Sequence, residues 1–109
     1  MKNSEIQFVA TFLNKLNTNE MSVDGLTKLI EYQDKLEASF EVFGKAQKKI
    51  FDGKEILTQT NDKIQFDKNQ ELLDKKVDIN TIELKKEEFL SSAKGIELNT
   101  IRVLLKLIY

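Results

Sequence analysis

The sequence predicts a mainly α-helical fold, in which a long N-terminal helical hairpin precedes a small C-terminal segment that mixes helix and short strands. Apolar residues recur at spacings of three and four over much of residues 1–53, which is typical of helices packed on one face. Alternating apolar and polar residues near Ile64 and Ile82 favour short strands. The length of 109 residues allows a single domain, with the hairpin in 1–53 and the mixed segment in 54–109.

The first predicted helix covers residues 4–16. Asn3 or Ser4 is suited to cap it, and Glu5 suits the positive end of the helix dipole. Its apolar stripe consists of positions three or four residues apart: Ile6, Val9, Leu13 and Leu16. Turn-forming residues at 17–20 then predict a short loop.

The second predicted helix is much longer and covers residues 23–51. Ser22 is suited to cap it, and Gly53 suits its end because glycine readily takes the left-handed conformation beyond a helix. Its seam follows a heptad register through Leu26, Leu29, Gln33, Leu36, Phe40, Phe43, Gln47 and Ile50. A helix of this length spans about 43 Å.

The two helices differ so much in length that the first cannot cover the whole seam of the second. The positions left over are Phe40, Phe43, Ile50 and Phe51. Either the C-terminal segment of the same chain or another protein chain must cover them, since apolar surface of this extent is rarely left in water. Gln33 and Gln47 on the seam are compatible with both alternatives, because a polar seam residue fixes the register between helices.

The predicted strands lie in the C-terminal half. Residues 64–66 and 82–84 alternate between apolar and polar side chains, and residues 96–98 are either a further strand or the entry to a helix. Before them, residues 54–60 extend the long helix or form a connector, and residues 61–62 form a turn.

Three shorter helices are also predicted. The first covers residues 69–76, and the second covers residues 87–94 and ends at Gly95. The third is capped by Asn99 or Thr100 and runs towards Tyr109. One face of this last helix collects Ile101, Leu104, Leu105 and Ile108.

The sequence contains no recognisable catalytic apparatus. The absence of cysteine removes thiolate chemistry, and the absence of histidine removes the usual general base near neutral pH and the commonest metal ligand. Calcium loops starting at Asp67 or Asp74 fail, because Leu72 replaces the central glycine of the first and Lys76 replaces a ligand of the second. The sequence therefore predicts a protein that is not an enzyme and holds no metal and no cofactor.

Neighbouring carboxylates are the other route to acid–base chemistry, because their pKa values can be driven apart. Glu31 with Asp34 and Glu87 with Glu88 are the two candidate pairs. In a lysine-rich helical chain such pairs are usually solvated, and we interpret both pairs as surface.

The charge balance argues against nucleic acid as a partner. The formal net charge is −1, and only Arg102 among the 17 basic residues is an arginine. The sequence contains no run of about 18 apolar residues, so no transmembrane helix is predicted. The start of the chain lacks the uninterrupted apolar core of a signal peptide, so we expect a cytoplasmic protein without a membrane partner.

Three stretches carry a resemblance to a known family. They are residues 12–16, the long charged helix from Leu26 to Phe51, and residues 95–98 leading to Leu104-Leu105. In this pattern the chain resembles a family of small uncharacterised proteins encoded by phages and prophages of Gram-positive bacteria. The resemblance implies a phage-encoded protein, located in the host cytoplasm or the virion, and it carries no functional residues.

These observations predict a non-enzymatic protein–protein interaction module, a phage-encoded structural or assembly protein that binds its own chain, as a homo-oligomer, or another chain. The alternative is a small inhibitor that blocks a host defence or transcription enzyme. Aromatic anchors dominate the energetics of interfaces, although the same residues can form an ordinary core. The candidate interface residues are Phe40, Phe43, Ile50, Phe51, Leu104 and Ile108.

Overall fold

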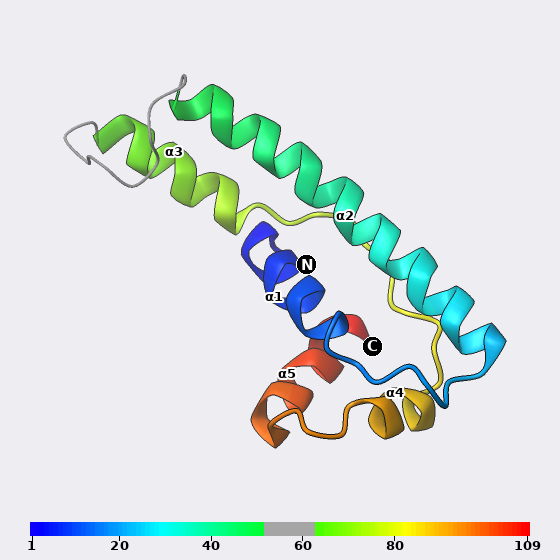
Figure 1. Ribbon diagram of the computed structural model, residues 1–109. Coiled ribbons are helices and arrows are strands. Elements are labelled where there is room, and N and C mark those ends of the chain that lie inside the picture. The colour runs from blue at the N-terminus through cyan, green and yellow to red at the C-terminus, as the bar shows by residue number, and fades with distance from the viewer. Residues whose placement is uncertain (52–62) are drawn as a thin grey trace.

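The computed structural model describes residues 1–51 and 63–109 (Figure 1). Over these residues the protein is mainly helical, as predicted. Its helices are α1 (Asn3–Leu13), α2 (Val23–Phe51), α3 (Lys63–Asp74), α4 (Lys86–Ser92) and α5 (Leu98–Ile108). The predictions for residues 52–62, including the stop at Gly53, lie outside the described part of the chain.

The prediction of a long second helix is confirmed, since α2 covers Val23–Phe51. α1 runs back along the first half of α2, and the side-chain amide of Gln33 donates to Oδ1 of Asn14 at 3.1 Å near the closed end of this hairpin (Figure 1). α1 ends at Leu13 rather than at residue 16, although Leu16 is still buried beyond the helix end. The short arm of the hairpin is therefore even shorter than predicted.

The second half of α2 is covered by α3, a helix of the same chain (Figure 1). The side-chain amide of Gln47 donates to Oδ1 of Asn69 at 3.1 Å, and that of Gln65 donates to the carbonyl of Ile50 at 3.3 Å. The C-terminal segment of the same chain, which was one of the two alternatives, thus covers a large part of the α2 seam.

The predicted strands are the main correction, because no strand occurs in residues 1–51 or 63–109. Residues 64–66 lie inside α3, where Gln65 faces α2 while Ile64 and Phe66 are exposed. Residues 82–84 are non-helical and buried at Ile82 and Leu84, yet they pair with no neighbouring strand. Residues 96–98 are the entry to a helix, since α5 begins at Leu98.

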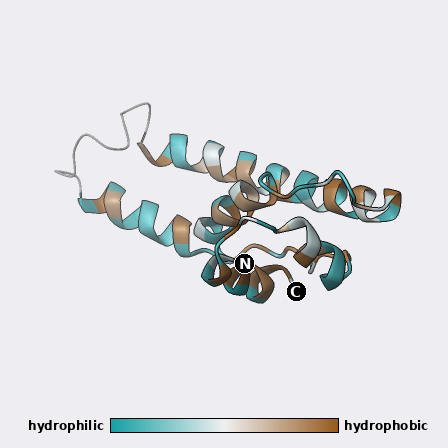
Figure 2. Cartoon of the chain, turned by 60° about the horizontal axis from the view of Figure 1, so that its bottom comes forward, coloured by the Kyte–Doolittle hydropathy of each residue, from teal (hydrophilic) through white to brown (hydrophobic). Residues whose placement is uncertain are grey.

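One core joins α1, α4, α5 and the first half of α2. Its fully buried members include Ile6, Val9, Leu13, Leu36, Leu84, Phe89, Leu104 and Ile108. Figure 2 shows the consequence for composition: the ribbon beside the C-terminus is predominantly hydrophobic, whereas α3 alternates between hydrophobic and hydrophilic residues. No helix in the described part of the chain is both long and apolar enough to cross a membrane.

The segment that follows α3 is held by the N-terminus of the chain. The backbone N–H of Val77 donates to the carbonyl of Met1 at 2.7 Å, and the N–H of Asn3 donates to the carbonyl of Lys75 at 3.1 Å. The buried side chain of Asn3 also donates to the carbonyl of Leu72 at 2.8 Å. These bonds fix residues 75–78 in position beside α2.

Candidate groove beside α2

The structure does not bring the six predicted interface residues together on one surface. Leu104 and Ile108 have 0% exposure and lie in the core with α1, while the second half of α2 lies towards the other end of the molecule (Figure 1). Phe43 and Phe51 are buried as well. As the chain is folded, it covers these four side chains itself.

Two of the six residues retain exposed surface. Phe40 is 43% exposed, with its ring centroid 6.0 Å from that of Phe43, and Ile50 is half-buried. The surface expected from the sequence is therefore reduced to the edge of the α2 seam.

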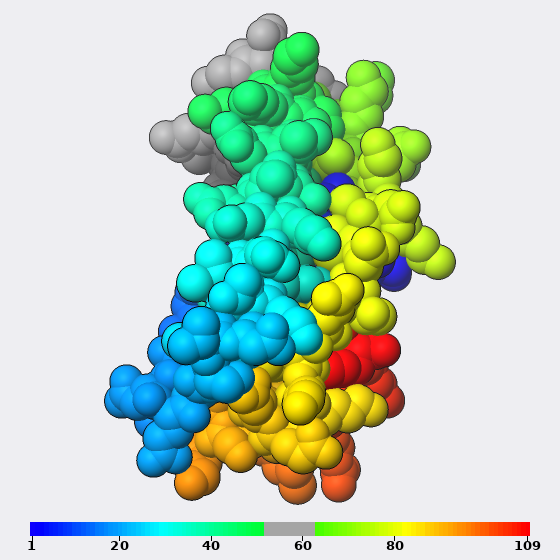
Figure 3. Space-filling view, turned by 90° about the vertical axis from the view of Figure 1, so that its right-hand side faces the viewer, coloured from blue at the N-terminus to red at the C-terminus, as the bar shows by residue number. Residues whose placement is uncertain are grey.

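A different apolar surface lies on the neighbouring face of α2. It is a groove of about 470 Å³ between α2 and the residues that follow α3. Figure 3 shows it between α2 (cyan to green) and the yellow-green to yellow segment, with blue atoms of the N-terminal residues visible inside. Its apolar and small lining residues are Ala38, Ser39, Val42, Phe43, Ala46, Leu72 and Val77.

Val42 is a large apolar side chain in this groove, and it is 67% exposed. It follows Ala38 and precedes Ala46 by four residues each, so all three lie on one stripe of the helix. Sequence reasoning missed this stripe because it lies beside the heptad seam and contains only one large apolar residue. The four-residue spacing of Ala38, Val42 and Ala46 is the signal that could have revealed it.

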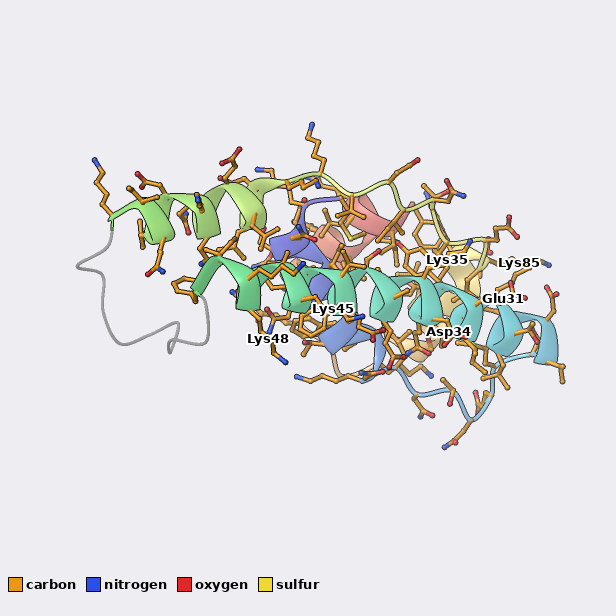
Figure 4. The ribbon with its side chains drawn as sticks, turned by 90° about the horizontal axis from the view of Figure 1, so that it is seen from above. Glu31, Asp34, Lys35, Lys45, Lys48 and Lys85 are labelled. Atoms are coloured by element: carbon orange, nitrogen blue, oxygen red, sulfur yellow. The ribbon has the colours of Figure 1, made fainter. Side chains whose placement is uncertain are left out.

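The charged residues around the groove are mostly lysines. The charged lining residues are Lys75, Lys76 and Asp78. On α2, Lys35 precedes Ala38 and Lys49 follows Ala46 by about one helical turn. All five are exposed, and none forms an ion pair with another described residue. Figure 4, seen from above, shows Lys35 and Asp34 at different edges of α2, so the groove edge is separated from this acidic side chain.

Two more cavities are polar. One of about 390 Å³ lies where the loop between α1 and α2 meets α4, and Glu20, Glu87 and Glu88 are its acidic lining residues. The other, of about 90 Å³, lies beside Tyr32 and is lined by both lysines and glutamates. Within the described ranges no group of three acidic residues is placed to hold a metal ion.

The two candidate carboxylate pairs lie in different surroundings, since only Glu87 and Glu88 line the cavity of about 390 Å³. Glu31 and Asp34 are both exposed on α2. Glu88 is half-buried, and its Oε1 accepts a hydrogen bond from the backbone N–H of Ser22 at 3.3 Å, next to the start of α2. Its position is that of a helix cap, because a carboxylate is stabilised at a helix N-terminus.

Lys28 and Asp24 form the shortest ion pair among the described residues, at 3.1 Å along α2. The hydrogen bond and charge of Asp24 raise the pKa of Lys28. This keeps Lys28 protonated and unsuited to act as a base.

Comparison with protein-family models, with curated proteins and with solved structures finds no match to this chain. The resemblance to phage and prophage proteins therefore stays a prediction.

Proposed function

We propose that this chain is a non-enzymatic protein–protein interaction module, and that it serves a phage as a structural or assembly protein. The observation that carries the proposal is the groove beside α2, with Val42 exposed within it. Apolar surface in a concave site is where proteins bind partners or ligands. The sequence offers no histidine or cysteine, and no group of three acidic residues in the described ranges is placed to hold a metal ion, which favours binding over catalysis.

The phage origin has a separate and compositional basis. Lys, Asn and Ile are abundant in the sequence, as in chains encoded by A·T-rich genomes of low-G+C bacteria and their phages. The host cytoplasm or the virion is the compartment that this origin implies.

The proposal is tested by affinity capture from the lysate of the cell that makes the protein, in three parallel experiments. The wild type is compared with Val42→Asp, which places a charge in the groove, and with Val23→Asp, which changes an 81% exposed valine of the same helix. We expect a protein that the wild type and Val23→Asp retain and that Val42→Asp loses, as measured by quantitative mass spectrometry.

Sedimentation of the purified chain adds the stoichiometry. A stable homo-oligomer fits a structural role, whereas a monomer that captures one partner in equal amount fits the alternative of a host inhibitor. A strictly monomeric wild type that retains no protein above background would contradict the interaction module itself.

A further inference from the structure

The groove beside α2 has a shape and a charge that together define one kind of occupant. We infer that it binds an amphipathic helix of another protein, whose apolar face enters the groove and whose flanks carry carboxylates. This inference rests on the proposed function and specifies the partner chemistry of that same surface.

The helical shape of the occupant follows from the α2 wall. Ala38, Val42 and Ala46 recur every four residues, and from the first to the last they cover about 12 Å along the helix axis. The two alanines of this row let a second helix approach closely on either side of Val42, because interaxial distances fall with the size of the side chains at the contact. Across the groove, Leu72 and Val77 offer apolar contacts to the same occupant. An occupant of about three helical turns would fill the row and extend past both ends.

The charge of the occupant follows from the rim. Lys75 and Lys76 line the wall opposite α2, and Lys35 and Lys49 flank the α2 stripe, while Asp78 is the only acidic lining residue in the described part of the chain. The chain as a whole has a net charge of −1, so this excess of lysine is local to the groove. Exposed ion pairs add little affinity, but they select partners and fix their orientation.

The same charge argues against a second copy of this chain in the groove. A symmetric dimer places the same patch of each copy against itself. The lysines of the two rims would then face each other, and such like-charge contacts are costly. An occupant that supplies carboxylates on both flanks relieves this repulsion.

The test uses the full chain and three synthetic helical peptides of about 18 residues, enough for five turns. The first carries Leu and Ala on one face with Glu on the flanks, the second replaces Glu with Lys, and the third is the first in scrambled order. We expect fluorescence anisotropy to show binding of the Glu-flanked peptide. The Lys-flanked and scrambled peptides should bind at least about tenfold more weakly.

Variants then locate the site. Val42→Asp should weaken binding of the Glu-flanked peptide about tenfold or more, and the matched control Val23→Asp should leave it unchanged. Lys75→Glu combined with Lys76→Glu should shift the preference towards the Lys-flanked peptide. All substituted positions are exposed, and circular dichroism verifies that each variant is folded.

Any of three peptide results would overturn the inference: no binding of the Glu-flanked peptide, equal binding of both charged peptides, or binding that Val42→Asp leaves intact. Self-association of the wild type that Val42→Asp abolishes would overturn it in favour of a second copy. If the peptides do not bind as expected but affinity capture still yields a partner, the proposed interaction function is kept. Only the inference that the groove binds an acidic amphipathic helix is then wrong.

Discussion

Two tyrosine hydroxyls near the core differ in their hydrogen bonding. Tyr109 donates from its hydroxyl to the carbonyl of Leu84 at 2.7 Å, which ties the end of α5 to the segment before α4. The hydroxyl of Tyr32 is buried and has no hydrogen-bond partner among the described residues. A buried polar group without a partner costs stability, whereas a satisfied one contributes to it.

Replacing each tyrosine by phenylalanine should therefore have opposite effects. Tyr32→Phe removes an unpaired hydroxyl and should raise the free energy of unfolding by up to about 1 kcal/mol. Tyr109→Phe leaves the Leu84 carbonyl without its donor and should lower the free energy of unfolding by about 1 kcal/mol. Urea unfolding followed by circular dichroism measures both, and a loss of stability in Tyr32→Phe would show that its hydroxyl is bonded in solution.

Tyr109 also predicts how stability depends on alkaline pH. Burial, and then the charges of Glu87 and Glu88, raise its pKa from 10.0 to about 12. Above pH 10.0 the unfolded chain releases this proton while the folded chain still holds it, so the contribution is complete below that pH and is lost as the pH rises towards about 12. The wild type should lose more stability between about pH 9 and pH 11 than Tyr109→Phe, and parallel curves would contradict this.

At the scale of the helix, α2 contains two glycines in different surroundings. A methyl group on Gly44 would meet open space, whereas one on Gly25 would overlap the carboxylate of Glu88 and approach Met21 closely. The Gly25 position therefore depends on the contact between α2 and α4 rather than on helix propensity alone.

Substitution with alanine should separate the two positions. Gly44→Ala should raise the free energy of unfolding by about 1 kcal/mol, since alanine is the better helix former. Gly25→Ala should gain about 1 kcal/mol less than Gly44→Ala, because the same gain in helix propensity is offset when the Glu88 carboxylate must leave the helix N-terminus. In a Glu88→Ala background, Gly25→Ala should become stabilising. A double-mutant cycle by thermal unfolding measures this coupling, and its absence would contradict the contact.

The sequence predicts α2 well because a heptad register kept over most of the helix has few other interpretations. An alternation of only three residues, as in 64–66, does not distinguish a strand from a helix. It also fits a helix in which Gln65 faces inwards. Residues 82–84 are non-helical, but the N–H of Ile82 bonds to the carbonyl of Ile108 rather than to a strand. That partner comes from tertiary packing, which local pattern does not contain.

The groove illustrates the same point for the candidate site. Val42 is visible in the sequence, but its neighbours across the groove, Leu72 and Val77, are about 30 or more positions away in the printed sequence. Leu72 lies beside α2 because α3 packs on that helix, and Val77 is held there by its backbone bonds to Met1. The unequal lengths of the first two helices predicted an uncovered apolar surface on α2, whereas the position of the groove required the structure.

At the scale of the whole molecule, the core position of α5 distinguishes it from an interface helix. Leu104 is fully buried and Leu98 is 61% exposed on the same helix. Leu104→Ala should lower the free energy of unfolding by about 2–5 kcal/mol through loss of burial and the resulting cavity, and Leu98→Ala should change it by less than about 0.5 kcal/mol. Equal small effects in urea unfolding would indicate that α5 is not part of the core.

The pairing of the first residues with the segment near Val77 also sets an order of events during synthesis. α1 and α2 can meet as soon as residues 1–51 have emerged, because both helices lie within this range. The backbone partners of Met1, at Val77, appear much later, and the bond between Ile82 and Ile108 later still. Closing such distant contacts is the slow part of folding. In the nascent hairpin, the Val42 face of α2 therefore stays uncovered by Leu72 and Val77 until most of the chain has left the ribosome.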